Sequence, residues 1–199
     1  MRKMRVAILI SGRGSNMAAL IRAAQDTDFP AKIALVLANV SGAGGLGIAE
    51  AAGIPTHTLD HKPYGKDRAG YDAAMQTVLE SHGIELVCLA GFMRILSPGF
   101  CEAWSGRMLN IHPSLLPAFK GLDTHARALA AGVSEHGCTV HFVTPGLDEG
   151  PTILQARVPV LAGDTEETLT ARVLAEEHRI YPEALKRVIL DLQHRFPDK

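Results

Sequence analysis

The sequence has 199 residues, of which 47% are hydrophobic and 21% are charged, and its formal net charge is −1. This size and composition predict a single globular domain over residues 1–199 with a sizeable core. Acidic and basic residues are mixed along the chain, which argues against nucleic acid as a partner, and no apolar run approaches the ~20 residues of a membrane span.

The three cysteines, Cys88, Cys101 and Cys138, have no C-x-x-C spacing. An odd number of cysteines without a signal sequence indicates a reducing compartment, so we expect a cytoplasmic protein. The N-terminal apolar run is short and leads directly into Ser11, which is typical of a strand rather than of a signal peptide. Cys88 lies inside an apolar run and is interpreted as a small core residue.

Strands and helices are expected to alternate along the chain. Apolar runs predict strands at residues 5–11, 33–39, 57–59, 86–90, 108–112, 139–143 and 153–160. Helices are expected after residue 15, at 46–52, at 67–81, after Ser97, at 123–131 and after residue 164. This alternation predicts a three-layer α/β fold, in which a mainly parallel, twisted, Rossmann-like sheet has helices on both faces. The strands after His136 are expected to be an antiparallel addition near the C-terminal part.

A short glycine loop at residues 12–16 follows the first strand and opens a helix. Such a loop can bind an anion, because its backbone amides converge and the helix N-terminus carries partial positive charge. Met17 stands where a dinucleotide fingerprint requires a third glycine, and the second strand ends at Asn39 without a carboxylate. A single phosphomonoester is therefore the better fit, and an ordinary tight strand-to-helix turn is the alternative.

Asn110 and His112 lie at the end of the strand predicted at 108–112. Residues i and i+2 of a strand point to the same side, so the two side chains should share one pocket. Asp148 lies in a glycine-rich turn from which a carboxylate could reach the imidazole. An amide donor, a titratable base and a carboxylate are what acyl transfer requires. A histidine like His112 would by itself more often be an ordinary residue at a strand end. The presence of Asn110 and Asp148 favours a catalytic role for it.

The remaining histidines predict no metal site. The spacing of His125, His136 and His141 matches no metal-ligand pattern. His141 alternates with apolar neighbours and is interpreted as a satisfied sheet residue.

A long C-terminal helix is expected to begin at Asp164, which would act as its N-cap with Glu167 as the return partner of a capping box. Pro182 is expected to kink or restart this helix. Glu176 and Glu177 would ordinarily form part of a solvated face.

Segments 89–97, 110–117 and 147–151 resemble the folate-dependent formyltransferases. With 11–16 and 176–182 added, the chain is similar in particular to the members that formylate a glycinamide ribonucleotide. The resemblance covers essentially the whole chain. It implies transfer of the formyl group of the co-substrate 10-formyltetrahydrofolate to the glycinamide amine of N1-(5-phosphoribosyl)glycinamide, in de novo purine biosynthesis.

The resemblance also implies roles for individual residues. Asn110 and His112 would stabilise the tetrahedral intermediate, and Asp148 would hold and tune His112. A direct histidine shuttle and a water relay through Asp148 are alternative routes for the proton. The expected partners are small-molecule substrates, with no metal, and the expected state is a monomer or homodimer. Gly14, Ser15, Asn16 and Glu177 would bind the ribosyl phosphate. The folate would contact Arg68, Met93, Arg94, Ile95, Leu96, Asn110, Thr144, Leu147 and Asp148, with Arg68 at its glutamate carboxylate.

The chain departs from this pattern at three places. Pro145-Gly146 stands where many relatives have an acidic residue before the Leu-Asp pair, Asp123 where some have histidine, and Arg13 where a small polar residue is common. The shape of the pterin pocket and the closure of the loop after Pro117 are therefore not predicted.

Three other functions are alternatives to this one. A formyltetrahydrofolate hydrolase would carry an additional N-terminal module and tends to have histidine where Pro113 stands. A methionyl-tRNA formyltransferase would continue beyond Lys199 into an RNA-binding domain. A silent folate-binding relative would have no need to retain Asn110, His112 and Asp148 together.

Overall fold

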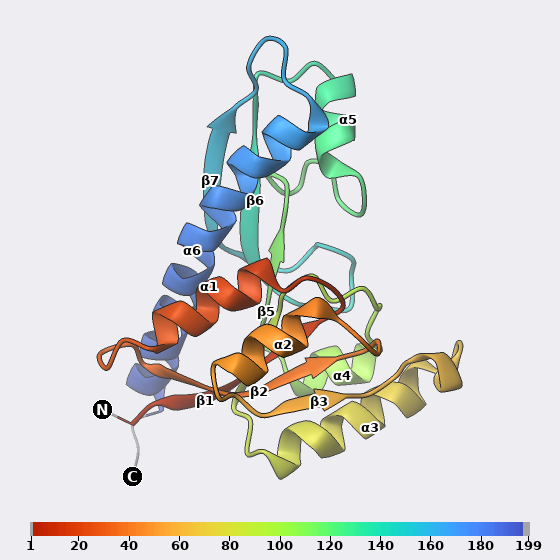
Figure 1. Ribbon diagram of the computed structural model, residues 1–199, viewed down its shortest axis with the longest axis vertical. Helices are drawn as coiled ribbons and strands as arrows, with labels where there is room; N and C mark the ends of the chain where they lie inside the picture. The colour runs from red at the N-terminus through yellow and green to blue at the C-terminus, as the bar shows by residue number, and fades with distance from the viewer. Residues whose placement is uncertain (1, 197–199) are drawn as a thin grey trace.

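The computed structural model describes residues 2–196, and its seven strands form one sheet (Figure 1). The strand order is β3-β2-β1-β4-β5-β6-β7. Strands β1 to β5 pair in parallel, whereas β6 is antiparallel to both β5 and β7. This confirms the predicted fold class, including the antiparallel addition. The strands are β1 (Met4–Ile10), β2 (Ala31–Ala38), β3 (Thr56–Thr58), β4 (Leu86–Leu89), β5 (Met108–His112), β6 (Glu135–Phe142) and β7 (Thr152–Pro159).

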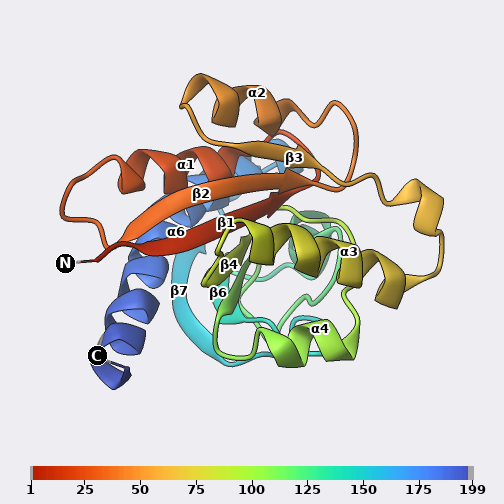
Figure 2. The ribbon, with the colours of Figure 1, turned by 90° about the horizontal axis from the view of Figure 1, so that it is seen from below.

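Helices cover both faces of the sheet (Figure 2). One face carries α1 (Ser15–Ala24), α2 (Gly44–Ala51) and α6 (Glu166–Arg195), and α5 (Thr124–Ala130) packs against α6. The other face carries α3 (Arg68–Ser81), which follows the 3-10 helix η1 (Lys62–Tyr64), and α4 (Pro98–Ala103). Within residues 2–196, no helix combines the length and the hydrophobicity needed to cross a membrane.

Strand β1 is apolar on both sides because both sides are covered. Val6, Ile8 and Ile10 belong to the core beneath α1, α2 and α6, whereas Ala7 and Leu9 belong to the core beneath α3 and α4. The same burial accounts for Cys88 in β4, which is fully buried as the sequence predicted.

Strand β6 begins at Glu135, four residues before the predicted start at 139. The sequence signal was missing because Gly137 has no side chain that could contribute to an apolar pattern. In the structure, a Cβ atom at Gly137 would lie 2.0 Å from the carbonyl oxygen of Ala156 on β7, so the glycine permits the close pairing of the two strands.

The predicted cap of α6 was wrong by one residue. Thr165 is the N-cap: its Oγ1 accepts a hydrogen bond from the N–H of Thr168, and its own N–H donates to Oγ1 of Thr168, which completes a capping box. The carboxylate of Asp164 instead accepts hydrogen bonds from the Leu161 backbone and from the Arg172 guanidinium. An ion pair to the next helical turn thus removes Asp164 from the capping position.

Helix α6 runs from Glu166 to Arg195 without the restart expected at Pro182. A proline inside a helix removes one hydrogen bond and costs about 3 kcal/mol. The neighbouring side chains Ile180, Tyr181, Ala184 and Leu185 are buried against the sheet, and this packing offsets the loss.

The topology places three chain segments together at the carboxyl ends of the parallel strands. Strand β1 lies between β2 and β4, so the connections leaving β1 and β4 diverge at their carboxyl ends. Such a switch point leaves a crevice in which ligands of open α/β sheets bind. The glycine loop follows β1, residues 91–97 follow β4, and His112 ends β5 at the same edge.

Candidate active site

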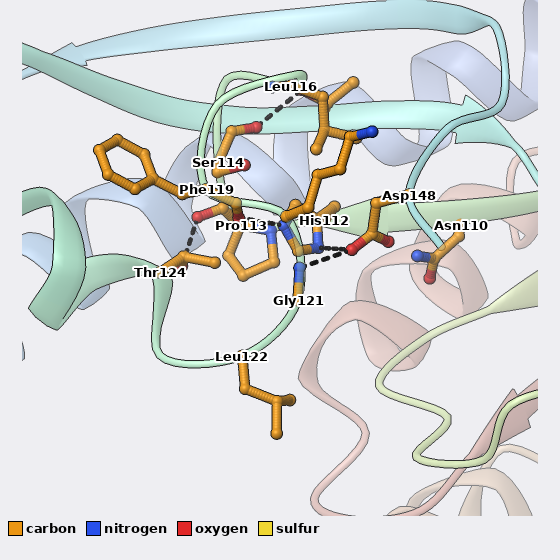
Figure 3. A network of polar contacts seen from close by, with 12 residues as sticks. Asn110, His112, Pro113, Ser114, Leu116, Phe119, Gly121, Leu122, Thr124 and Asp148 are labelled. Carbon is orange, nitrogen blue, oxygen red and sulfur yellow. Dashed lines mark hydrogen bonds and ion pairs between the residues drawn. The ribbon is translucent and has the colours of Figure 1, made fainter. Parts of the chain in front are cut away.

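Asn110 and His112 project from β5 on the same side of the sheet, as their spacing predicted, and Asp148 lies beside them (Figure 3). The side chains of His112 and Asp148 are only 7% and 8% exposed, and Nδ1 of His112 lies 3.5 Å from Oδ2 of Asp148. The carboxylate also accepts a hydrogen bond of 2.8 Å from the backbone N–H of Gly121. The structure therefore brings together the amide, the imidazole and the carboxylate that the sequence singled out.

The second ring nitrogen of His112 also has a hydrogen-bond partner. Its Nε2 donates a hydrogen bond of 2.9 Å to the backbone carbonyl of Phe119. Both ring nitrogens thus face oxygen acceptors, an arrangement that suits a doubly protonated imidazolium. Phe119 belongs to the loop after Pro117, so this loop contacts the site directly at His112 and, through Gly121, at Asp148.

The turn that carries Asp148 folds back tightly onto β6. A Cβ atom at Gly150 would lie 1.7 Å from the carbonyl oxygen of Phe142, so only glycine allows this approach. Asp148 itself has a φ of +52°, which is uncommon for a residue with a side chain. The turn thus directs the carboxylate toward β5 at the cost of a strained backbone.

His141 is a buried sheet residue with both ring nitrogens in hydrogen bonds, as the sequence predicted, and its partners give it a further role. It pairs directly with Asn110 across the β5–β6 ladder, and its Nε2 lies 3.3 Å from Nδ2 of Asn110. Its Nδ1 faces the carbonyl of Phe142, so Nδ1 carries the proton and Nε2 accepts from Asn110. Burial lowers the pKa of His141, which favours this neutral form. His141 therefore fixes which way the Asn110 amide points.

The glycine loop opens α1 with features of an anion site. Gly14 is the N-cap, with a φ of +74°, and no side chain within residues 2–196 caps the helix. Gly45 of α2 packs against the loop so closely that a Cβ atom there would lie 3.2 Å from Cα of Gly14 and 2.6 Å from Cδ1 of Ile10. The sequence did not single out Gly45, because its contact with Gly14 is visible only when α2 is placed against the loop.

Asn16 and Glu177 are joined although they are far apart in the sequence. Nδ2 of Asn16 donates a hydrogen bond of 2.6 Å to Oε2 of Glu177, and Oδ1 of Asn16 is buried without a partner in the described part of the chain. Glu177 is 7% exposed rather than part of a solvated face, and burial raises the pKa of its carboxyl group. Gly14, Ser15, Asn16 and Glu177 thus gather at the start of α1.

The residues predicted to bind folate fall into two groups. Arg68, Arg94 and Ile95 line a cavity of about 430 Å³ together with Gly65 and Lys66. The guanidinium of Arg94 lies 4.4 Å from the centre of the Tyr71 ring and donates to the carbonyl of Asp67, which fixes its position.

The second group follows the edge of the crevice. Met93, Ile95 and Leu147 are large apolar side chains that are 60%, 54% and 58% exposed. Exposed apolar side chains in such number favour a ligand surface. Thr144 is half-buried just after β6, whereas the side chain of Leu96 is buried in the core, so only the backbone of Leu96 is left to face a ligand.

His125 and His136 lie side by side in the fold. Nε2 of His136 lies 3.2 Å from Nδ1 of His125, and burial lowers the pKa of His136 to about 4. Among residues 2–196 there is no group of three or more histidine, cysteine or acidic side chains that could hold a metal ion.

Comparison with known proteins identifies relatives over most of the chain. The model of the formyl transferase family matches residues 4–185. Phosphoribosylglycinamide formyltransferase of Escherichia coli is 50% identical over 179 residues, which are 90% of this chain and 84% of that protein. The trifunctional purine biosynthetic protein adenosine-3 of Bos taurus is 54% identical over 94% of this chain, but the chain spans only 18% of that relative's length.

A solved structure shows the same fold. The crystal structure of phosphoribosylglycinamide formyltransferase from Brucella melitensis superimposes with a TM-score of 0.90 at 53% sequence identity. The match covers 94% of this chain and 96% of that one.

Proposed function

The chain belongs to the formyl transferase family, and on this premise we propose that it formylates N1-(5-phosphoribosyl)glycinamide with 10-formyltetrahydrofolate in de novo purine biosynthesis. The observation that carries the proposal is the meeting of Asn110, His112 and Asp148 at the carboxyl ends of the strands, where the glycine loop opens a helix that no side chain within residues 2–196 caps. An acyl-transfer group and a phosphate site at one crevice fit a phosphorylated amine as acceptor. The name of the Escherichia coli relative, phosphoribosylglycinamide formyltransferase, supports the same substrate.

The phosphate of the acceptor would lie at Gly14, Ser15 and Asn16, where no side chain of the described residues caps the first N–H groups of α1. The carboxylate of Glu177 would accept hydrogen bonds from the ribose hydroxyls. Its present partner is the amide of Asn16, so one contact would orient both residues toward the same substrate.

The folate would lie along residues 93–96 and the turn at 144–148. The exposed side chains of Met93, Ile95 and Leu147 would cover its rings, and the cavity lined by Arg68 and Arg94 would receive its glutamate carboxylate. No metal is needed in this scheme, because the charge that develops is met by hydrogen-bond donors.

In the reaction, the nitrogen of the glycinamide amine attacks the formyl carbon, and the carbonyl electron pair moves onto the formyl oxygen. Asn110, oriented by His141, donates its second N–H to this oxygen. His112 donates to the same oxygen from Nε2 after the substrate has replaced the Phe119 carbonyl as acceptor. Collapse of the intermediate breaks the bond to N10, which takes up a proton, while the amine gives one up. Asp148 holds the imidazolium throughout.

The deciding experiment follows tetrahydrofolate formation with and without N1-(5-phosphoribosyl)glycinamide. We expect turnover only when the glycinamide is present, with the formylated product appearing in equal amount. Turnover with water alone would instead identify a hydrolase, and formylation of a methionyl-tRNA in place of the glycinamide would also contradict the proposal. Asn110→Ala and Asp148→Asn should each lower kcat by about 10²–10³ without altering the unfolding transition.

A further inference from the structure

The side chain of Ser11 joins three elements of the sheet at the point where the glycine loop begins. Its Oγ donates a hydrogen bond of 2.6 Å to Oδ1 of Asn39, at the end of β2. The same Oγ accepts a hydrogen bond of 2.7 Å from the backbone N–H of Met93, beyond β4. The backbone N–H of Ser11 donates to the carbonyl of Gly91 at 3.1 Å. One residue thus holds the segment after β4 at two positions.

Asn39 fixes the direction of the Ser11 hydroxyl. It is fully buried, and its Nδ2 has no hydrogen-bond partner within residues 2–196. An unpaired buried amide nitrogen lowers the stability of the fold, so a purely structural role does not account for Asn39 at this position. Because its Oδ1 takes the hydroxyl proton of Ser11, the lone pairs of Oγ are free to accept from Met93. In dinucleotide-binding folds this strand end carries a ribose-binding carboxylate, whereas here the side chain serves Ser11.

Met93 is the first residue of the segment at 93–96 that the proposed function assigns to the folate. Its side chain and that of Ile95 are exposed, so apolar packing does little to hold the start of the segment, whereas the buried side chain of Leu96 holds its end. Two backbone N–H groups are held as well. Ser11 accepts from Met93, and the buried carboxylate of Asp72 on α3 accepts a hydrogen bond of 2.6 Å from the N–H of Ser97.

We propose that Ser11 is a positioning residue for the formyl donor: its hydroxyl, oriented by Asn39, holds the Met93 backbone in the place that binds the pterin. The proposal rests on the proposed function. It also places the start of the phosphate loop and the start of the folate segment on one side chain, so both substrates are positioned from the same strand end.

The test compares Ser11→Ala, Ser11→Cys and Ser11→Thr with the wild-type enzyme. Loss of the acceptor in Ser11→Ala should raise KM for 10-formyltetrahydrofolate about five- to twentyfold, with kcat and KM for the glycinamide changed less than about twofold. Ser11→Cys, whose thiol is a weaker acceptor, should lie between, and Ser11→Thr should restore the wild-type value. Ser81→Ala serves as the matched control, because among residues 2–196 the hydroxyl of Ser81 bonds only to Val78 and His82, within α3 and at its end.

Hydrogen exchange of the Met93 amide gives a second readout that does not depend on turnover. It should be slow in the wild type and in Ser11→Thr, and at least tenfold faster in Ser11→Ala. If Met93 exchanges faster in Ser11→Ala while KM for the folate stays within twofold of wild type, the positioning role is disproved, and the proposed function stands. If the wild-type enzyme transfers no formyl group, the proposed function fails, and the positioning role falls with it. A fall in kcat together with similar rises in both KM values in Ser11→Ala would show a general structural role and overturn the proposal.

Discussion

Asn110 and His141 face each other directly across the β5–β6 ladder, with Nδ2 of the amide 3.3 Å from Nε2 of the imidazole. This contact removes the ambiguity of the amide orientation, because a neutral His141 with its proton on Nδ1 can only accept at Nε2. The oxyanion donor of the proposed mechanism is therefore held by a residue that does not itself need to touch the substrate.

We expect His141→Ala to lower kcat about 10- to 100-fold, which is less than Asn110→Ala, because the donor is kept but its orientation is lost. The double variant should be no slower than Asn110→Ala alone, since His141 acts through Asn110. Steady-state kinetics of the three variants at saturating substrates measure this. Additive losses would mean that His141 has a separate role in the reaction.

The contact between Gly45 and Gly14 should control binding of the phosphate. Gly45→Ala would place a Cβ atom 2.6 Å from Cδ1 of Ile10, which is held in the core, and the loop would have to shift. We expect KM for the glycinamide ribonucleotide to rise about tenfold, with a smaller change in KM for the folate.

The matched control is Gly47→Ala in the same helix, where a Cβ atom would meet nothing within 4 Å. It should leave KM unchanged and stabilise the fold by up to about 1 kcal/mol through helix propensity. If Gly45→Ala and Gly47→Ala bind the glycinamide ribonucleotide equally well, the close packing of α2 does not shape the glycine loop.

The buried carboxyl group of Glu177 should lower the stability of the folded protein by an amount that depends on pH. Burial raises the pKa of its carboxyl group above the ordinary value of 4.5, so above that pH the unfolded chain binds fewer protons than the folded one. Stability contributed by this group therefore falls as the pH rises. Urea unfolding should find Glu177→Gln more stable than wild type at pH 7 and nearly equal to it at pH 4.

Glu177→Gln should also bind the glycinamide ribonucleotide less well, because a neutral amide accepts hydrogen bonds from the ribose hydroxyls more weakly than a carboxylate does. A rise of KM of about tenfold is expected. A Glu177→Gln protein that is less stable than wild type at pH 7 would contradict the inferred cost of burying the charge.

The start of α6 offers a test of stability alone. Thr165→Ala should cost about 1 kcal/mol, because it removes the acceptor for the N–H of Thr168. Glu167→Ala should cost less than about 0.5 kcal/mol, since Glu167 does not take part in the capping box that the structure forms. Equal losses, measured by urea unfolding, would argue for the cap that the sequence suggested.

At two positions of α6, contacts outside the local sequence pattern decided the structure. Asp164 and Thr165 are both good N-caps, and the choice between them depended on Arg172, which draws Asp164 into an ion pair. Glu177 reads as a solvated residue on a long helix until α1 brings Asn16 against it, across a sequence separation of 161 residues. In each case a partner outside the local pattern decided the outcome.

Local patterns in the sequence were enough to predict the α/β fold, the glycine loop and the shared side of Asn110 and His112. These follow from strand and helix periodicity and from the chemistry of adjacent residues, which are properties of chain neighbours. The folded chain was needed to show three contacts: His141 with Asn110, Gly45 with Gly14, and Ser11 with Met93. Strand register and helix placement set those contacts, and both result from packing of the whole core rather than from any local pattern.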